Sequence, residues 1–239
     1  MKKPLFFLVF CVLLTTLITV RAISSTKPSY YPEPIFQVEG SDEGVIFFTF
    51  NILWGEAQLD ALLELLDERE IKAVFFMTGQ WLKKHPLKAK KIIEHGHWIG
   101  NHTHSHSRLP LMEEEEITEE IYLFNNLCKE TLNEKPVFFR PPYGEYNPRI
   151  VRIARENDCF TLLWSINALM LSNLEMELIM SHIEEQIHAG AVILFHTTSP
   201  GILESLPQFI DFLKWKGYSI ALPDLILEYA EKKFPLPGR

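Results

Sequence analysis

Residues 98–106 read Trp-Ile-Gly-Asn-His-Thr-His-Ser-His, an apolar run that passes directly into a turn holding three of the chain's nine histidines. Neutral imidazole is a common protein ligand for zinc and similar ions. Because His102 and His106 stand four positions apart, their rings can converge on one ion from a single tight turn. A solvated polar loop with incidental histidines is the alternative, and the spacing by itself does not decide between the two.

Two later apolar runs also end in residues that can take part in chemistry. Residues 138–144 read FFRPPYG and residues 192–197 read VILFHT, so Arg140 and His196 each follow a strand-like segment. In barrels of parallel strands, functional side chains gather at the carboxyl ends of the strands. The residues expected to meet at that edge are Asn51, His102, Arg140, Trp164 and His196.

Strand-like and helix-like segments alternate along the chain, which predicts repeated βα units and a parallel sheet. The expected strands are 45–50, 73–77, 98–100, 137–139, 160–164, 191–195 and 218–221. The expected helices are 56–69, 86–95, 113–132, 148–157, 174–188, 202–215 and 224–232. A sheet of seven such strands can be open or closed, and 239 residues with 47% hydrophobic content suit a single domain.

The N-terminus has the composition of an export segment. Two lysines precede the apolar stretch 5–20, which matches a signal peptide or a short membrane anchor within residues 1–22. Residues 23–42 contain prolines and serines without helix or strand periodicity, so we expect a mobile linker there. The folded domain is then expected at 43–239, and the protein is expected to be secreted or anchored outside the cytoplasm.

Composition also argues against some functional classes. A formal net charge of −8 disfavours nucleic-acid binding, and we find no phosphate-binding loop. Cys128 and Cys159 imply no disulfide framework and are expected to be buried free thiols. We expect a monomer.

The segments at 94–102, 138–144, 163–165 and 192–197, in this order and spacing, resemble the polysaccharide deacetylase family, also called the NodB-homology or carbohydrate esterase 4 group. The resemblance extends from about residue 45 to about residue 225 and implies an α/β fold, a distorted (β/α)7 barrel. It also implies a hydrolase that uses a divalent metal, zinc in the first instance, to remove N-acetyl groups from peptidoglycan or a chitin-like polysaccharide. Residues 49–55, TFNILWG, look most like the Bacillus-type sporulation deacetylases.

The resemblance assigns a role to each of the chemistry-bearing residues. His102 and His106 correspond to the metal ligands, and His196 to the general acid that protonates the departing amine. Arg140 corresponds to the residue that orients the catalytic carboxylate, because a guanidinium fork fits two carboxylate oxygens.

Three further residues correspond to the family's substrate-binding positions. The backbone N–H of Tyr143 would face the developing oxyanion. Trp164 and Leu194 would form walls of the acetyl pocket, although both residue types are equally at home in an ordinary core.

The first motif departs from the family pattern. The family has an Asp pair, a base followed by a third metal ligand, where this chain has Asn51 and Ile52. Asparagine does not accept a proton at physiological pH, and isoleucine does not bind metal. The Asp expected to tune His196 is likewise replaced, by Asn167.

Two substitutes for these groups are conceivable. In the first, Glu56 or Asp60 would act as a carboxylate ligand or base. In the second, a zinc ion held by two histidines and extra waters would still lower the pKa of a bound water enough for slow hydrolysis of the substrate, and Asn51 would only position that water. The alternative to an enzyme is a weak or inactive family member that binds glycan or a protein partner through the same cleft.

Overall fold

The computed structural model describes residues 33–41, 44–168 and 183–235. The expected export segment 1–22, most of the expected linker and most of the helix expected at 174–188 lie outside these residues. Among the helices of the described ranges, none is long and apolar enough to cross a membrane.

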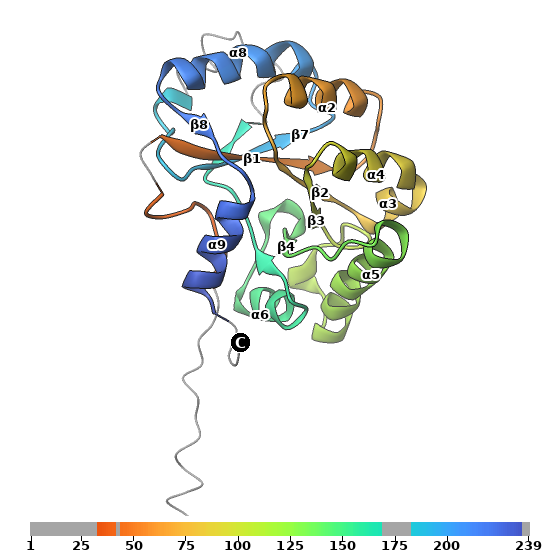
Figure 1. Ribbon diagram of the computed structural model, residues 1–239. Coiled ribbons are helices and arrows are strands. Elements are labelled where there is room, and N and C mark those ends of the chain that lie inside the picture. The colour runs from red at the N-terminus through yellow and green to blue at the C-terminus, as the bar shows by residue number, and fades with distance from the viewer. Residues whose placement is uncertain (1–32, 42–43, 169–182, 236–239) are drawn as a thin grey trace, which may run out of the picture. The chain divides into compact units, whose positions relative to one another are not determined.

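A parallel sheet forms the centre of the molecule, and the helices lie around it (Figure 1). Its strands are β1 (Val45–Ile52), β2 (Val74–Met77), β3 (Trp98–Asn101), β4 (Phe138–Phe139), β5 (Phe160–Thr161), β6 (Ile166–Asn167), β7 (Val192–His196) and β8 (Ser219–Ile220). They are ordered β5-β4-β3-β2-β1-β7-β6, and β8 pairs with the start of β1. This curled parallel sheet confirms the α/β fold and the distorted barrel expected from the sequence.

The helices match the expected segments closely where the structure describes them. They are α2 (Leu59–Glu68), α3 (Gly79–Lys84), α4 (Pro86–Glu94), α5 (Glu114–Leu132), α6 (Pro148–Glu156), α8 (Ile202–Trp215) and α9 (Asp224–Lys233), with short 3₁₀ turns at Leu109–Leu111 and Pro142–Gly144. Helix α3 was not expected. It begins at the hydroxyl of Thr78, which accepts from the backbone N–H of Trp81 at 3.2 Å, a regular N-cap.

The strand expected at 160–164 ends at Thr161 as β5, and a separate short strand, β6, follows beyond the expected range. The N–H of Leu162 donates to Phe139, but the N–H of Leu163 donates to Ile35 and that of Ser165 to Val192. The chain therefore changes hydrogen-bonding partners within four residues, and this interrupts the strand.

Side-chain alternation sorts the sheet into two apolar faces. The outward cluster packs beneath the helices and includes Ile46, Phe48, Phe50, Phe75, Ile193 and Phe195. The inward cluster fills the barrel and includes Phe47, Val74, Phe76, Phe138, Leu162 and Val192. Continuing the inward alternation along each strand leads to Thr49 and Asn51, to Arg140, and to Leu194 and His196, so the barrel interior becomes polar at the carboxyl ends.

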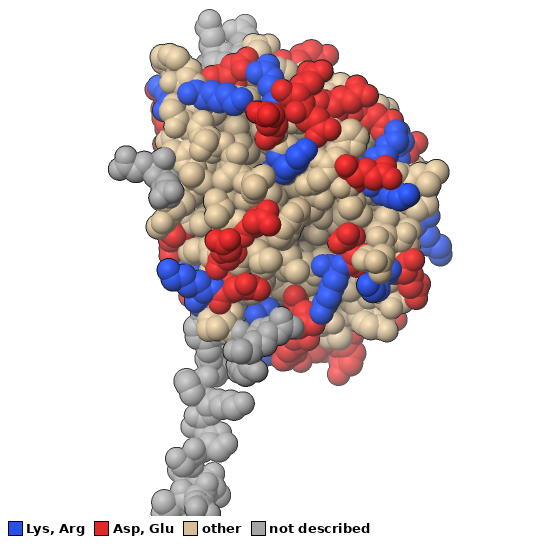
Figure 2. Space-filling model, viewed as in Figure 1, with Lys and Arg blue, Asp and Glu red and all other residues tan. Residues whose placement is uncertain are grey.

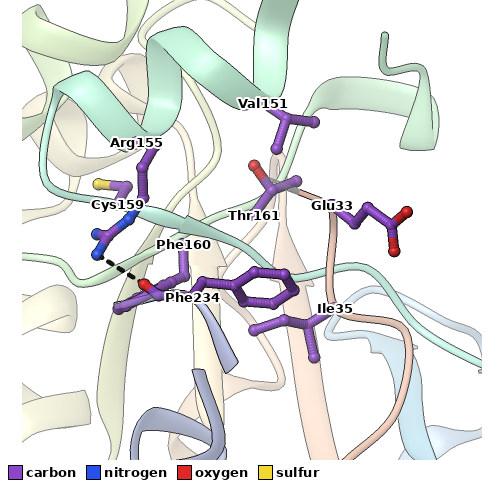
Figure 3. Close-up of a pocket in the computed structure, with 8 residues that line it drawn as sticks. All are labelled: Glu33, Ile35, Val151, Arg155, Cys159, Phe160, Thr161 and Phe234. Carbon is purple, nitrogen blue, oxygen red and sulfur yellow. Dashed lines mark hydrogen bonds between the residues drawn. The ribbon is translucent and has the colours of Figure 1, made fainter. Parts of the chain in front are cut away.

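Residues 33–38 differ from the mobile linker expected there. The N–H of Ile35 donates to Thr161, and that of Val38 donates to Gly190, both at 2.8 Å. Both side chains are buried, and Figure 3 shows Ile35 beside Phe234 near the C-terminal end of the described chain. The segment is ordered because it bridges β5 and the start of β7, where unpaired backbone groups and apolar surface are available to it.

Candidate active site

The carboxyl ends of β4, β3, β1 and β7 bring Arg140, His102, Asn51 and His196 to one edge of the sheet. Asn51 of β1 and His196 of β7 are partners in the strand register. The N–H of His102, just after β3, donates to Met77 of β2 at 3.1 Å. The N–H of Arg140, just after β4, donates to the backbone of Asn101 at 2.8 Å.

Arg140 is completely buried and is held by four hydrogen bonds. Its Nε donates to Leu162 O at 3.0 Å and its Nη2 to Leu163 O at 2.9 Å. The remaining two bonds go to side chains, from Nη1 to Asn51 Oδ1 at 3.0 Å and from Nη2 to Thr49 Oγ1 at 2.9 Å. All four acceptors are neutral, so Asn51 keeps the hydrogen bond that a carboxylate would make but contributes no negative charge.

The guanidinium of Arg140 also stacks on an aromatic ring. Its central carbon lies 4.0 Å from the centroid of Phe76, a contact that suits the planar cation. Gly100 is required beneath that ring, because a Cβ at position 100 would lie 2.4 Å from Phe76 Cδ1. The depth of Arg140 in the barrel therefore depends on a glycine of the neighbouring strand β3.

A side-chain network shapes the turn that carries the histidines. Asn101 is fully buried; its Nδ2 donates to Ile121 O at 3.0 Å, and its Oδ1 accepts from the N–H of Thr103 at 2.8 Å. The hydroxyl of Thr103 then accepts from the N–H of His106 at 3.0 Å. Thr103 and His106 both have positive φ, 68° and 64°, a conformation that side chains other than glycine rarely adopt.

Sequence reasoning assigned no role to Asn101 or Thr103. The sequence did contain one indication, because Asn101 is a polar residue at the end of an apolar strand. A buried amide needs hydrogen-bond partners and tends to organise the backbone around it.

His102 presents an imidazole lone pair to the site. Its Nδ1 lies 2.7 Å from Arg140 O, and because a carbonyl only accepts, Nδ1 carries the proton and Nε2 is unprotonated. Nε2 is buried and has no hydrogen-bond partner in the described residues. Burial lowers the pKa of His102 to about 3, so the ring is neutral at pH 7.

His106 faces His102, with ring centroids 5.0 Å apart and an interplanar angle of 73°. Burial also lowers the pKa of His106. The pair therefore supplies two neutral imidazoles from one turn, the form in which histidine binds divalent metals. His104, between them, lies against α3 instead: a Cβ added to Gly79 would lie 2.3 Å from His104 Nδ1.

A third metal ligand is missing from the described part of the chain, where no group of three His, Cys, Asp or Glu side chains is placed to hold an ion. Ile52 is buried in the outward cluster with Leu59 and Met77, so its side chain faces the helices rather than the site. The donor set fits two-point metal binding and does not fit a site with three protein ligands.

The two carboxylates considered as substitutes are engaged elsewhere. Glu56 pairs with His85. Asp60 pairs with Lys88 at 2.8 Å and with Lys91 at 3.2 Å, and these bonds hold its pKa below the usual value. Both carboxylates are therefore paired with residues of α4 or of the position just before it.

His196 lies at the end of β7, half-buried, with a buried Nδ1 that has no hydrogen-bond partner in the described residues. Burial lowers its pKa to about 4, and the charges of Arg140 and His106 act in the same direction. The ring is thus neutral at pH 7. His196 must therefore take up a proton before it can act as an acid, because its imidazole is neutral at pH 7.

The turn after β4 borders the histidine pair. Tyr143, with φ of 62°, is largely exposed, and its ring centroid lies 4.8 Å from that of His106. A Cβ at Gly144 would lie 2.8 Å from Trp164, so the turn packs closely on that indole. Trp164 is half-buried near Arg140, whereas Leu194 is buried in the barrel interior.

The chain is similar to one protein family and to several individual proteins. A family model described as polysaccharide deacetylase matches residues 39–160. The chain is 32% identical to the YlxY protein of Bacillus subtilis, over 82% of this chain and 63% of that protein. It is 31% identical to a peptidoglycan-N-acetylglucosamine deacetylase of Bacillus cereus, over 72% of this chain and 64% of that enzyme. The chain thus spans less than two thirds of the length of either relative.

Among solved structures, a CE4 family pseudoenzyme from Bacillus anthracis superposes with a TM-score of 0.74 at 29% identity, over 79% of this chain and 66% of the other. A mutant of that pseudoenzyme, described as having restored enzymatic activity, superposes equally well.

Figure 2 shows acidic and basic side chains interspersed over one face of the present chain, with uncharged residues between them.

Proposed function

The chain belongs to the polysaccharide deacetylase family, and from that premise we propose that it removes N-acetyl groups from a peptidoglycan or chitin-like polysaccharide at a low rate. The observation that carries this proposal is the preserved pair of neutral imidazoles beside Arg140 and His196. His102 offers an unpartnered Nε2 lone pair, and His106 faces it at a centroid distance of 5.0 Å. The deacetylase relative from Bacillus cereus supports the choice of substrate.

The proposal includes a divalent cation, zinc in the first instance, held by His102 and His106. When bound, such an ion polarises a carbonyl and lowers the pKa of a coordinated water. Two protein ligands hold an ion more weakly than three, so we expect partial loss of the metal during purification.

The chain's own residues then explain why the rate is low. Asn51 is fixed by Arg140 through its Oδ1, so it can orient a ligand through Nδ2 but cannot accept a proton. Loss of a general base typically lowers the rate by about 10²–10⁴-fold. His196 remains close enough to Asn51 in the strand register to hold a proton near the leaving amine.

A second candidate function is glycan binding without hydrolysis. It is favoured by the neutral contact between Asn51 and Arg140 and by the outward position of Ile52, since neither residue then supplies a carboxylate base or a third ligand. Similarity to a pseudoenzyme of the same fold also supports it.

Measurement of metal content and acetate release separates the two functions. The wild-type chain is incubated with N-acetylglucosamine oligomers in excess zinc, beside the variants His102→Ala, His104→Ala and Asn51→Asp. A deacetylase releases acetate slowly, loses this activity with His102→Ala and keeps it with His104→Ala, because the latter ring lies against Gly79. We expect Asn51→Asp to raise the rate about 10²-fold or more.

Acetate release from Asn51→Asp alone would exclude hydrolysis by the natural chain and would favour glycan binding. Absence of both activity and zinc binding from every variant would exclude the deacetylase.

We also propose that the domain acts outside the cytoplasm as a monomer, secreted or held at the membrane by residues 1–22. The lysines and apolar stretch of that segment support export. Fractionation of cells that express the full chain, with and without residues 2–22, tests this: retention of both forms in the cytoplasm would exclude it.

A further inference from the structure

Two exposed aromatic side chains meet on the surface although they are far apart in the sequence. The ring centroids of Phe36 and Tyr146 lie 6.0 Å apart at an interplanar angle of 64°, an edge-to-face contact. Phe36 is 40% exposed and Tyr146 is 42% exposed. Single exposed apolar side chains are ordinary on a protein surface, whereas a group of them marks a surface that binds something.

Both rings belong to the surroundings of Trp164. Tyr146 stands two residues after the glycine at which a Cβ would lie 2.8 Å from the indole. The carbonyl just before Phe36 accepts from the N–H of Leu163 at 2.8 Å. The indole of Trp164 in turn lies 5.5 Å from the guanidinium carbon of Arg140. The aromatic pair therefore lies beside the loop that borders the candidate site.

Aromatic surface continues from this pair toward the histidines. Tyr143 is largely exposed, and its ring centroid lies 4.8 Å from that of His106. Tyr143 stands three positions before Tyr146, and three residues of chain span at most about 11 Å. A ligand bound at the histidines can therefore extend over the turn and reach the ring of Phe36.

The segment that carries Phe36 is held in place. The N–H of Ile35 donates to Thr161 O and that of Val38 donates to Gly190 O, both at 2.8 Å. The side chains of Ile35 and Val38 are buried, whereas Phe36 between them is turned to the surface. A ring on an anchored segment loses little conformational freedom when a ligand covers it.

Tyr146 is also held from both sides. Glu145 before it forms an ion pair with Arg108. The side chain of Asn147 after it accepts from the N–H of Ile150 at 3.0 Å and so caps α6. The two rings are thus presented to solvent on anchored backbone, an arrangement that suits recognition of a ligand.

The chemistry of the rings indicates what they bind. The face of a sugar ring carries C–H groups, which fit the electron-rich face of an aromatic ring. The rings of Phe36, Tyr143, Tyr146 and Trp164 together expose on the order of 400 Å². That area suits a small ligand and is well below the roughly 800 Å² that each partner buries in a stable protein–protein interface.

We propose that Phe36 and Tyr146 form a stacking platform for a neutral sugar ring of the polysaccharide, beyond the sugar whose N-acetyl group faces the histidines. The inference rests on the proposed function for the identity of the ligand, a glycan. The platform extends the site along the polymer, so the chain prefers long oligomers to short ones.

Binding of a short and a long N-acetylglucosamine oligomer tests the platform. Dissociation constants of the dimer and the hexamer are measured by titration calorimetry for the full chain in excess zinc, over a time in which little acetate is released. Acetate release from both oligomers is measured separately. We expect the hexamer to bind about tenfold more tightly than the dimer, the gain expected from one stacked ring.

Substitutions that remove an aromatic face but keep apolar bulk locate this gain. Phe36→Leu and Tyr146→Leu should each lower the affinity for the hexamer about five- to tenfold and leave the affinity for the dimer unchanged. Tyr146→Phe keeps the ring and should leave both affinities unchanged. The matched control Tyr122→Leu removes a ring that is 57% exposed on α5 and should also leave both unchanged.

Equal affinity of the wild-type chain for the two oligomers would overturn the inference, and the exposed rings would then be candidates for contact with a protein. An affinity for the hexamer that survives both leucine substitutions would overturn it as well. An equal loss of affinity for the dimer and the hexamer would do the same, because the substitutions would then have disturbed the whole site. Absence of acetate release from either oligomer, with the length preference intact, would overturn the proposed hydrolysis and support the platform.

Discussion

The β3–β4 side of the site and the β1 side differ in what they retain. On the β3–β4 side, His102 and His106 face each other, and the guanidinium of Arg140 donates to the backbone carbonyls of Leu162 and Leu163. On the β1 side, Asn51 supplies a neutral acceptor and Ile52 packs outward into the core. The residues that position the histidines and the arginine therefore match the family pattern, whereas the residue at the position of the proton acceptor does not.

Backbone conformation follows the same division. Thr103, His106 and Tyr143 all have positive φ on the β3–β4 side, and buried hydrogen bonds hold the histidine turn in place. On the β1 side, β1 continues as regular strand through Ile52. Unfavourable backbone conformations are retained where the surrounding packing and hydrogen bonds hold the chain in place, and such positions are common at ligand sites.

The largest expected effect comes from placing the same carboxylate at two adjacent positions of β1. Ile52→Asp buries a carboxylate in an apolar cluster and leaves a cavity, so we expect it to lower the free energy of unfolding by about 5 kcal/mol. Asn51→Asp faces Arg140 instead and should change it by less than about 1 kcal/mol at pH 7. Urea denaturation of both variants measures the difference; equal losses would mean that the two side chains do not face opposite sides of the sheet.

Arg140→Met tests whether the guanidinium holds the two sides together. It leaves four buried acceptors without a donor, and we expect a loss of about 3–4 kcal/mol in the free energy of unfolding. Arg152→Met removes an arginine from the surface of α6, where ion pairs contribute little, and should cost less than about 1 kcal/mol. A similar cost for both variants would show that the buried network does not stabilise the fold.

His97 is a buried histidine just before β3 that lies outside the site. Its Nδ1 accepts from the N–H of Ala73 at 3.2 Å, and burial, aided by the charge of Lys72, lowers its pKa to about 4. Between pH 6.5 and 4 the unfolded chain takes up a proton that the native chain does not, so this contribution to stability is present above pH 6.5 and is lost as the pH falls toward 4.

The difference between 6.5 and about 4 corresponds to about 3 kcal/mol. His97→Gln keeps an acceptor for Ala73 and does not titrate, so its free energy of unfolding should fall less steeply with acid than that of the wild-type chain. Denaturation curves collected from pH 7 to pH 4 measure this; parallel pH profiles would show that His97 titrates alike in both states.

The smallest expected effect concerns the turn that brings Tyr143 to the histidines. Gly144 and Gly40 share a φ of 71°, but a Cβ at Gly144 would meet Trp164 at 2.8 Å, whereas nothing lies within 4 Å of one at Gly40. Gly40→Ala should cost about 1 kcal/mol for the backbone conformation alone, and Gly144→Ala about 1 kcal/mol more. Thermal unfolding measures the costs, and only Gly144→Ala should change the fluorescence of Trp164; equal effects would place Trp164 away from the turn.

Local sequence patterns determined much of the fold. The predicted helix 202–215 has the bounds of α8, because a single amphipathic period runs through it. The alternation within β1 and β7 directs Asn51 and His196 inward, and the motif order indicated the family that the comparisons confirm. These features depend on residues close together in the chain.

The position of each site atom depended on contacts between distant segments, which no local pattern encodes. The orphaned Nε2 of His102 follows from a carbonyl 38 residues away, and the neutral pairing of Arg140 from a side chain 89 residues away. Ile35 is ordered by strands that follow it by more than a hundred residues. The sequence by itself determined the strands, the motifs and the missing acids. Only the tertiary structure decided which way Ile52 points and that the hydrogen-bond acceptors of Arg140 within the described residues are neutral, because burial and hydrogen bonding are set when distant strand ends meet.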